Sequence, residues 1–149
     1  MNAYFDTGVL VKLYCPEPNT PEAIALVKRF DPPIAFCHWQ EIEIQNALRL
    51  KLFREEFTAA GLKKALGLLR ADVESGLLRR VPLDMREVFR VAGELSGKHT
   101  ATMGCRTLDI LHVAVAKMIE ARIFVTFDAR QAAVASKAGL KVLPAKKAA

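Results

Sequence analysis

The chain has 149 residues, of which 52% are hydrophobic and 26% charged, a composition that fits one folded domain and excludes a disordered chain. We expect a single domain over residues 1–149, frayed only at its end, from Lys146 to Ala149. The net charge of +6 is compatible with a polyanionic partner without identifying one. Three cysteines, an odd number, argue against a disulfide framework and favour a reducing cytoplasm. No apolar run is long enough to span a membrane, and the N-terminus is not a signal peptide.

Short apolar runs alternate with longer helical patterns, which is typical of an α/β protein. In chain order we expect a strand at Ala3–Phe5, helices at Val9–Tyr14 and Glu22–Phe30, and a strand at Ile34–Phe36. Next come helices at Glu41–Phe53 and Thr58–Leu69, a strand at Leu77–Val81, a helix from Asp84 to about Leu95 and a polar loop at Gly97–Cys105. The last elements are a helix at Thr107–Glu120, a strand at Ile123–Thr126, a helix that begins at Asp128 and is stopped by Gly139, and a strand at Leu140–Leu143. Five strands separated by helices predict a central, mostly parallel five-stranded sheet covered on both faces.

Several of these helices carry capping signals at their ends. Asp84 is followed three residues later by Glu87, and Asp128 by Gln131, which is the pattern of an N-terminal capping box. Thr58 can cap the helix that it opens.

Two acidic residues follow the ends of predicted strands. Asp6 comes after Ala3–Phe5, and Asp128 comes after the strand that begins at Ile123. Open parallel sheets bind ligands beyond the carboxyl ends of their strands. These two carboxylates are therefore candidate site residues.

Two further acidic residues lie between apolar neighbours in helices that we expect to be mostly buried. Glu43 lies between two isoleucines, and Asp109 lies between Leu108 and Ile110. A carboxylate among apolar side chains is costly unless a polar group or an ion pairs with it. Asn46 and His112 follow the two acids at a spacing of three residues, on roughly the same helical faces.

If the four carboxylates meet in one pocket, they repel each other unless a cation lies between them. Oxygen ligands without cysteine favour Mg²⁺ or Mn²⁺ over Zn²⁺, and such an ion can support phosphoryl chemistry. Each acid also has a structural interpretation, which stays open at this point. Asp128 could serve as a helix cap and nothing more, and Asp6 could be a turn residue. Glu43 could face solvent, and Asp109 could accept a hydrogen bond from a nearby backbone amide.

The pattern resembles the PIN-domain family and, within it, the VapC-like toxins. The resemblance covers essentially the whole chain and rests on Tyr4-Phe5-Asp6-Thr7, Glu43-Ile-Gln-Asn46-Ala-Leu, Thr107-Leu-Asp109-Ile-Leu-His112-Val-Ala and Val125-Thr126-Phe127-Asp128. One position departs from the pattern: Gly8 stands where relatives often carry serine or another small polar residue. That difference removes a polar contact but no carboxylate.

The resemblance implies a three-layer α/β/α fold and hydrolysis of RNA with Mg²⁺ or Mn²⁺ in an acidic pocket. Carried over position by position, it implies that the metal-site acids are Asp6, Glu43, Asp109 and Asp128. Asp6 and Asp109 would be the direct ligands, and Asp128 would act through water. The supporting residues would be Thr7, Asn46 and Thr126.

The resemblance also implies partners. A small PIN protein of this kind is expected to pair with an antitoxin and to form a homodimer. RNA would be held by basic residues, for which Lys98, His99 and Arg106, in the expected loop before the Asp109 helix, are weak candidates, because a solvated loop would carry the same residues.

Two other functions remain open. The first is a PIN-like module that binds RNA or protein without cutting, although such modules usually lack some of the four acids. The second is an RNA-processing nuclease with no antitoxin. A nucleotide-binding P-loop is excluded, because Gly93–His99 is one residue short of the motif and lacks its final serine or threonine.

Overall fold

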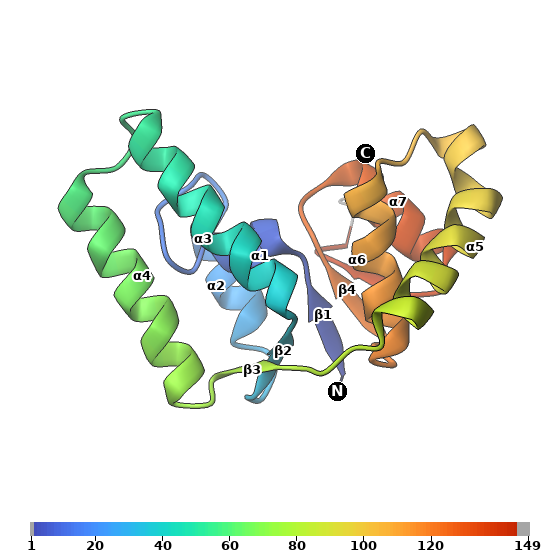
Figure 1. Ribbon diagram of the computed structural model, residues 1–149, viewed down its shortest axis with the longest axis horizontal. Helices are drawn as coiled ribbons and strands as arrows, with labels where there is room; N and C mark the ends of the chain where they lie inside the picture. Colours follow the sequence, from blue (N-terminus) through green and yellow to red (C-terminus); the bar gives the residue numbers. More distant parts are fainter. Residues whose placement is uncertain (1, 146–149) are drawn as a thin grey trace. The chain divides into compact units, whose positions relative to one another are not determined.

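A computed structural model describes residues 2–145, so the predicted frayed end at Lys146–Ala149 lies outside the described residues. The elements, in chain order, are β1 (Ala3–Phe5), α1 (Thr7–Val11), α2 (Thr20–Val27), β2 (Ile34–Phe36), α3 (His38–Phe53), α4 (Ala59–Glu74), β3 (Leu78–Arg80), α5 (Met85–Met103), α6 (Thr107–Met118), β4 (Ile123–Val125), α7 (Ala129–Lys137) and β5 (Lys141–Leu143). They confirm the α/β class (Figure 1). Within the described part of the chain, none of these helices combines the length and the apolar character needed to cross a membrane.

The chain divides into two compact units. The first joins the N-terminal residues up to Asp6 to the chain from Pro82 onward, and the second comprises Thr7–Val81. The boundary between Asp6 and Thr7 separates two residues that the sequence analysis placed in the same site.

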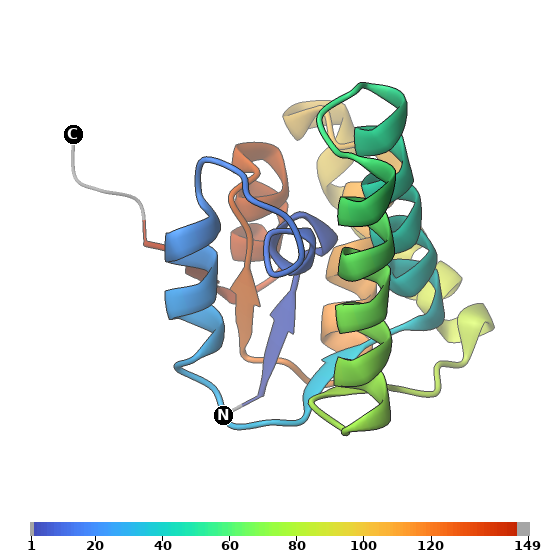
Figure 2. The same ribbon diagram turned by 90° about the vertical axis from the view of Figure 1, so that its left-hand side faces the viewer.

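The first unit is built on a parallel sheet with the strand order β1-β4-β5. Phe5 pairs with Val125, and Val125 pairs in turn with Leu143. All residues of β1 and β4 are buried, as expected for parallel strands covered on both faces. Figure 2 shows β1 and β4 side by side, pointing in the same direction.

Backbone bonding continues one residue beyond these strands. The Asp6 amide donates to the Val125 carbonyl, and the Thr126 amide donates to the Leu143 carbonyl, both at 2.9 Å. Asp6 and Thr126 therefore leave neighbouring strands at the same edge of the sheet. This is the edge where parallel sheets place their ligand sites.

Helices α5, α6 and α7 pack together in the same unit. The α6 helix buries an almost continuous run, from His112 to Ala116, which includes a histidine among small apolar residues. Below it, the rings of Tyr4 and Phe124 stack at 5.3 Å between centroids. The polar side chains of this unit that are buried with them include His112, Thr126 and Gln131.

The second unit holds a two-stranded parallel sheet, in which β2 pairs with β3, and a helical layer. Helix α1 packs on α3, and α3 packs on α4 (Figures 1 and 2). Ile44 and Leu48 on α3 and Ala65 and Leu69 on α4 are buried, and their spacing of four residues gives each helix one apolar stripe.

The expected single five-stranded sheet is wrong. The five strands exist, but they form a three-stranded and a two-stranded parallel sheet. Each strand has only three residues, and an apolar triplet predicts a strand without predicting its hydrogen-bonding neighbour.

The expected loop at Gly97–Cys105 is also wrong. Helix α5 continues to Met103 and ends at Gly104, whose φ of 67° is a left-handed conformation that glycine adopts without strain. Gly97 lies inside the helix, where glycine costs about 1 kcal/mol relative to alanine. Other helix ends differ from the prediction in the same way, because polar end residues carry no apolar periodicity: α3 begins at His38 and α4 runs to Glu74.

The predicted N-cap residues are confirmed, but the predicted capping box at Asp84 is only half formed, because the Glu87 carboxylate accepts from Arg90 instead of from the N-cap amide. The side chains of Thr58, Asp84 and Asp128 accept hydrogen bonds from backbone amides in the first turns of α4, α5 and α7. Gly139, with a φ of 91°, follows the end of α7 as predicted.

Candidate functional site

Asp6 is held by a hydrogen-bond network in the first unit. Thr126 Oγ1 donates to Asp6 Oδ2 at 3.2 Å, and the Asp128 amide donates to Thr126 Oγ1 at 3.0 Å. The order of residues after β4 produces this arrangement, because Thr126 leaves the strand beside Asp6 and Asp128 turns the chain into α7. Thr126 thus contacts Asp6 directly, and its supporting role in a metal site stays a prediction.

Gln131 completes this network, a role that its capping-box position in the sequence does not indicate. With its amide nitrogen turned toward Asp6, it donates to Oδ2 at 3.0 Å, to Oδ1 at 3.1 Å and to Thr126 Oγ1 at 3.1 Å. This orientation is the consistent one, because a hydroxyl has a single hydrogen and Thr126 already donates it to Asp6. Gln131 is 2% exposed, so its amide depends on these partners.

The predicted capping box at Asp128 and Gln131 is only half formed. Asp128 Oδ1 accepts from the amides of Arg130 and Gln131, at 2.9 and 3.0 Å. The Gln131 side chain turns inward to Asp6 and Thr126 instead of returning to the N-cap. The sequence signal for the cap was present, but no sequence signal distinguishes an inward from an outward glutamine at this position.

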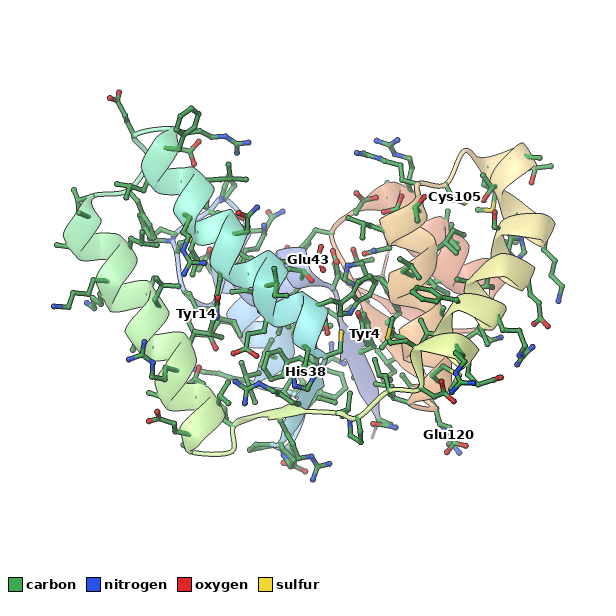
Figure 3. All side chains as sticks on the ribbon, viewed as in Figure 1. Tyr4, Tyr14, His38, Glu43, Cys105 and Glu120 are labelled. Atoms are coloured by element: carbon green, nitrogen blue, oxygen red, sulfur yellow. The ribbon has the colours of Figure 1, made fainter. Side chains whose placement is uncertain are left out.

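His112 approaches Asp6 from α6. Its Nε2 lies 3.8 Å from Asp6 Oδ1, and its Nδ1 is hydrogen bonded to the Tyr4 hydroxyl. Figure 3 labels Tyr4 on β1, from which its ring points toward the helices of the same unit. His112 is therefore buried between Tyr4 and Asp6.

A second threonine and glutamine pair holds Glu43 in the second unit. Thr7 Oγ1 donates to Glu43 Oε1 at 2.9 Å, and Gln40 Nε2 lies 3.5 Å from Thr7 Oγ1. Gln40 is fully buried, and its Oε1 accepts from the Cys37 amide, which fixes the amide orientation. Glu43, labelled in Figure 3, lies on α3 and is partly buried.

The Cys37 thiol at the start of α3 stays protonated at neutral pH. Burial raises its pKa to about 11, and the nearby charge of Glu43 acts in the same direction. In this protonated state the thiol is a poor nucleophile.

Asp109 lies in the first turn of α6, and its Oδ2 accepts from the Arg106 amide at 3.1 Å. This is the structural interpretation that the sequence also allows for Asp109, and Asp128 likewise caps α7. Each of these caps uses one carboxylate oxygen. Within residues 2–145, Asp109 Oδ1 and Asp128 Oδ2 accept no hydrogen bond, so capping leaves an oxygen of each acid available.

The burial argument for the two helical acids is wrong in part. Leu108 beside Asp109 is 50% exposed, and Ile42 beside Glu43 is 67% exposed. Adjacent helical residues point about 100° apart, so one apolar neighbour can face the core while the other faces solvent. Both acids are only partly buried.

The weaker site predictions have mixed outcomes. Lys98 and His99 lie within α5 and not in a loop, which removes the loop argument for contact with RNA. Arg106 is the N-cap residue of α6 and is exposed. Asn46 is exposed on α3, three residues after Glu43.

The donor set suits a hard cation. All four candidate ligands are carboxylates, which Mg²⁺ and Mn²⁺ prefer. Among residues 2–145, no three His, Cys, Asp or Glu side chains are grouped closely enough to hold an ion together. Mg²⁺ typically binds through one or two carboxylates and keeps several waters, so a site of this type does not need such a group.

The PIN-domain family model matches residues 3–137, and the chain belongs to this family. The match includes both compact units and all four candidate acids. Among solved structures, the fold is similar to that of FitAcB from Neisseria gonorrhoeae, with a TM-score of 0.66 and 18% identity over 94% of this chain and 95% of that one. No match to a curated protein was found.

Proposed function

We propose that this chain is an Mg²⁺- or Mn²⁺-dependent endoribonuclease that hydrolyses RNA phosphodiester bonds, and that it is the toxin of a VapC-like type II toxin–antitoxin pair. The observation that carries the proposal is the Asp6 carboxylate at the sheet edge, held by Thr126 and Gln131 in a chain of the PIN-domain family. PIN domains are generally nucleases, and preorganised carboxylates of this kind suit metal-assisted phosphoryl chemistry.

The proposed catalytic acids are Asp6, Glu43, Asp109 and Asp128. By their likeness to the family motifs, Asp6 and Asp109 would contact the ion directly and Asp128 would act through water. A bound ion of this kind supplies a nucleophile at neutral pH and offsets charge on the phosphate.

The chain's own residues orient these acids. Thr126 and Gln131 donate hydrogen bonds to Asp6, and these bonds fix the position of its carboxylate. Thr7 does the same for Glu43, and the buried Gln40 lies against Thr7. We propose that the whole chain acts as one PIN domain.

The first test is cleavage of mixed cellular RNA by the purified protein, with Mg²⁺ or Mn²⁺ and then with EDTA. Wild-type protein is expected to cut only with metal, and Asp6→Asn is expected to be inactive. Asp31→Asn is the matched control, because Asp31 is exposed and lies outside the acidic set. Equal cutting by wild type and Asp6→Asn would refute the site, and binding of RNA without cutting by folded wild type would favour a non-catalytic module.

The toxin proposal needs a separate test. Expression of the chain alone is expected to arrest growth, and co-expression of a short neighbouring reading frame is expected to relieve the arrest and to co-purify with the chain. Metal-dependent cutting without arrest or such a partner would favour an RNA-processing nuclease. Light scattering of the purified chain would test the proposed homodimer.

A further inference from the structure

A charged pocket of about 360 Å³ lies between α3 and α4 in the second unit. Three arginines line it, Arg49 from α3, Arg70 from α4 and Arg80 from β3, over a floor that includes Leu66 and Leu69. This volume falls in the range of sites that hold a small ligand or one segment of a polymer. No part of the proposed acidic site lines this pocket.

Ion pairing does not neutralise all three arginines. Arg80 is bound to Glu41 by two hydrogen bonds, of 2.6 and 2.8 Å, and this pairing lowers the pKa of Glu41. In the part of the chain that the structure describes, Arg49 and Arg70 make no ion pair. Glu74 is the other acid on the pocket wall, so one positive charge remains uncompensated.

The pocket faces away from Glu43. Glu41, Gln45 and Arg49 follow each other at intervals of four residues, so they share one face of α3. Glu43 is two residues from both Glu41 and Gln45, which places it about 160° around the helix. A ligand in the pocket is therefore separated from Glu43 by the body of α3.

We propose that this pocket binds a phosphate of the RNA substrate at a distance from the bond that is cut, with Arg49 and Arg70 as the phosphate-binding residues. Guanidinium groups bind phosphate through paired hydrogen bonds, and the apolar floor can contact the attached nucleoside. The Arg80–Glu41 pair fixes one wall of the pocket. Arg49 donates one hydrogen bond, from Nη1 to Gln45 Oε1 at 3.5 Å, so it and Arg70 still have guanidinium donors for the ligand. This inference rests on the proposed ribonuclease function, and it adds that RNA long enough to reach around α3 binds more tightly than short RNA.

The test compares Arg49→Ala/Arg70→Ala with Arg29→Ala/Arg86→Ala, which removes the same charge at two exposed positions outside the pocket. Binding of a labelled, mixed-sequence single-stranded RNA is measured in the Asp6→Asn background over a range of salt concentrations. The pocket variant is expected to bind about tenfold more weakly, and the slope of log affinity against log salt is expected to fall by about 0.7 for each lost phosphate contact. Thermal melting checks that both variants are folded.

Cleavage by variants with intact acids provides a second readout. The pocket variant is expected to raise KM for long RNA while kcat is unchanged, and to cut a short oligoribonucleotide like wild type. Arg49→Lys/Arg70→Lys is expected to restore part of the affinity, because lysine keeps the charge without the paired donors.

Two outcomes overturn the inference. The first is a pocket variant whose RNA affinity and salt slope are the same as those of the parent protein. The second is a control variant that loses as much RNA affinity as the pocket variant, because the loss would then come from net charge and not from the pocket. The outcomes for the proposed function are separate. If wild type cuts RNA and the pocket variant binds RNA normally, the pocket proposal is refuted and the ribonuclease proposal stands. If RNA binding depends on the two arginines but no RNA is cut, the ribonuclease proposal is refuted and the pocket remains an RNA-binding site.

Discussion

The Thr126 hydroxyl donates a hydrogen bond to the Asp6 carboxylate, Oγ1 to Oδ2 at 3.2 Å, across 120 positions of sequence. The same hydroxyl accepts from the Asp128 amide at 3.0 Å. One threonine therefore holds the carboxylate at the end of β1 and the turn that starts α7. The Thr126 hydroxyl therefore acts as a donor to Asp6 and as an acceptor from the Asp128 amide, so the geometry of both hydrogen bonds fixes its orientation.

Thr126→Val should reduce cleavage and stability together. Valine keeps the shape but leaves the Asp128 amide and one Asp6 oxygen without this partner, which costs about 1–3 kcal/mol of unfolding free energy. Loss of a residue that orients a metal ligand typically reduces activity by about 10–100-fold. Urea unfolding and RNA cleavage measure the two effects. Thr126→Ser keeps the hydroxyl and should retain most of the activity, and a serine variant as inactive as valine would contradict this role.

Gln131→Met should weaken the site from the other side of Asp6. Methionine has a similar length but no donor, so Asp6 loses hydrogen bonds at both oxygens. We expect a loss of about 1–3 kcal/mol in stability and a 10–100-fold drop in cleavage. Gln131→Glu should be worse, because it places a second carboxylate against Asp6. For stability the control is Gln45→Met on α3, a half-buried glutamine outside this network, and an equal effect there would argue against a specific role of Gln131.

Thr7→Val should impair cleavage through Glu43. Thr7 is buried and donates to Glu43 Oε1 at 2.9 Å, so valine leaves that carboxylate without this donor. We expect cleavage to fall by about tenfold or more while Thr7→Ser stays active. Glu43→Gln tests the acid itself and should abolish cutting without unfolding the chain, as judged by circular dichroism. Full activity of Glu43→Gln would remove Glu43 from the catalytic set.

The free energy of unfolding should fall as the pH is lowered into the acidic range, because Glu17 becomes protonated. Burial acts to raise its pKa, but hydrogen bonds from Lys12 and Lys51 outweigh burial, so the pKa lies below its ordinary 4.5. The folded state thus binds fewer protons than the unfolded state, and the stabilisation is present above pH 4.5 and lost as pH falls through the folded-state pKa.

Glu17→Gln should therefore destabilise the protein by about 1 kcal/mol near neutral pH, and the difference from wild type should shrink in acid. Urea unfolding at a series of pH values measures this. Glu22→Gln, at an exposed position of α2, is the matched control and should show no such trend. A difference that grows as pH falls would reverse the sign of the argument.

Much of this fold and site was readable from local patterns. Short runs that contain apolar residues located all five strands, including β3 and β5, which also carry basic residues. Thr58, Asp84 and Asp128 located helix starts through capping chemistry. The candidate acids were found because two follow strands and all lie in motifs that resemble the PIN family, whose model matches the chain. That the four act together stays a prediction.

Other features were decided by contacts between distant segments. The division of five strands into two sheets depends on which strands exchange hydrogen bonds, and three-residue strands carry no local record of their partners. Helix α5 continues through Gly97, although glycine inside a helix costs about 1 kcal/mol relative to alanine. Packing of α5 against α6 offsets this cost. Local propensity is a weak term that tertiary burial readily outweighs.

The sequence by itself determined the residue types of the site: carboxylates suited to a hard cation, a threonine next to Asp6 and a second threonine two residues before Asp128. Only the tertiary structure decided that Gln131 turns inward to Asp6 and that Gln40 lies against Thr7, which donates to Glu43. A buried amide must find donors and acceptors wherever the fold supplies them, and in both cases the partner comes from a distant segment. The sequence around a glutamine does not contain that partner, so its direction becomes defined only when the chain has folded.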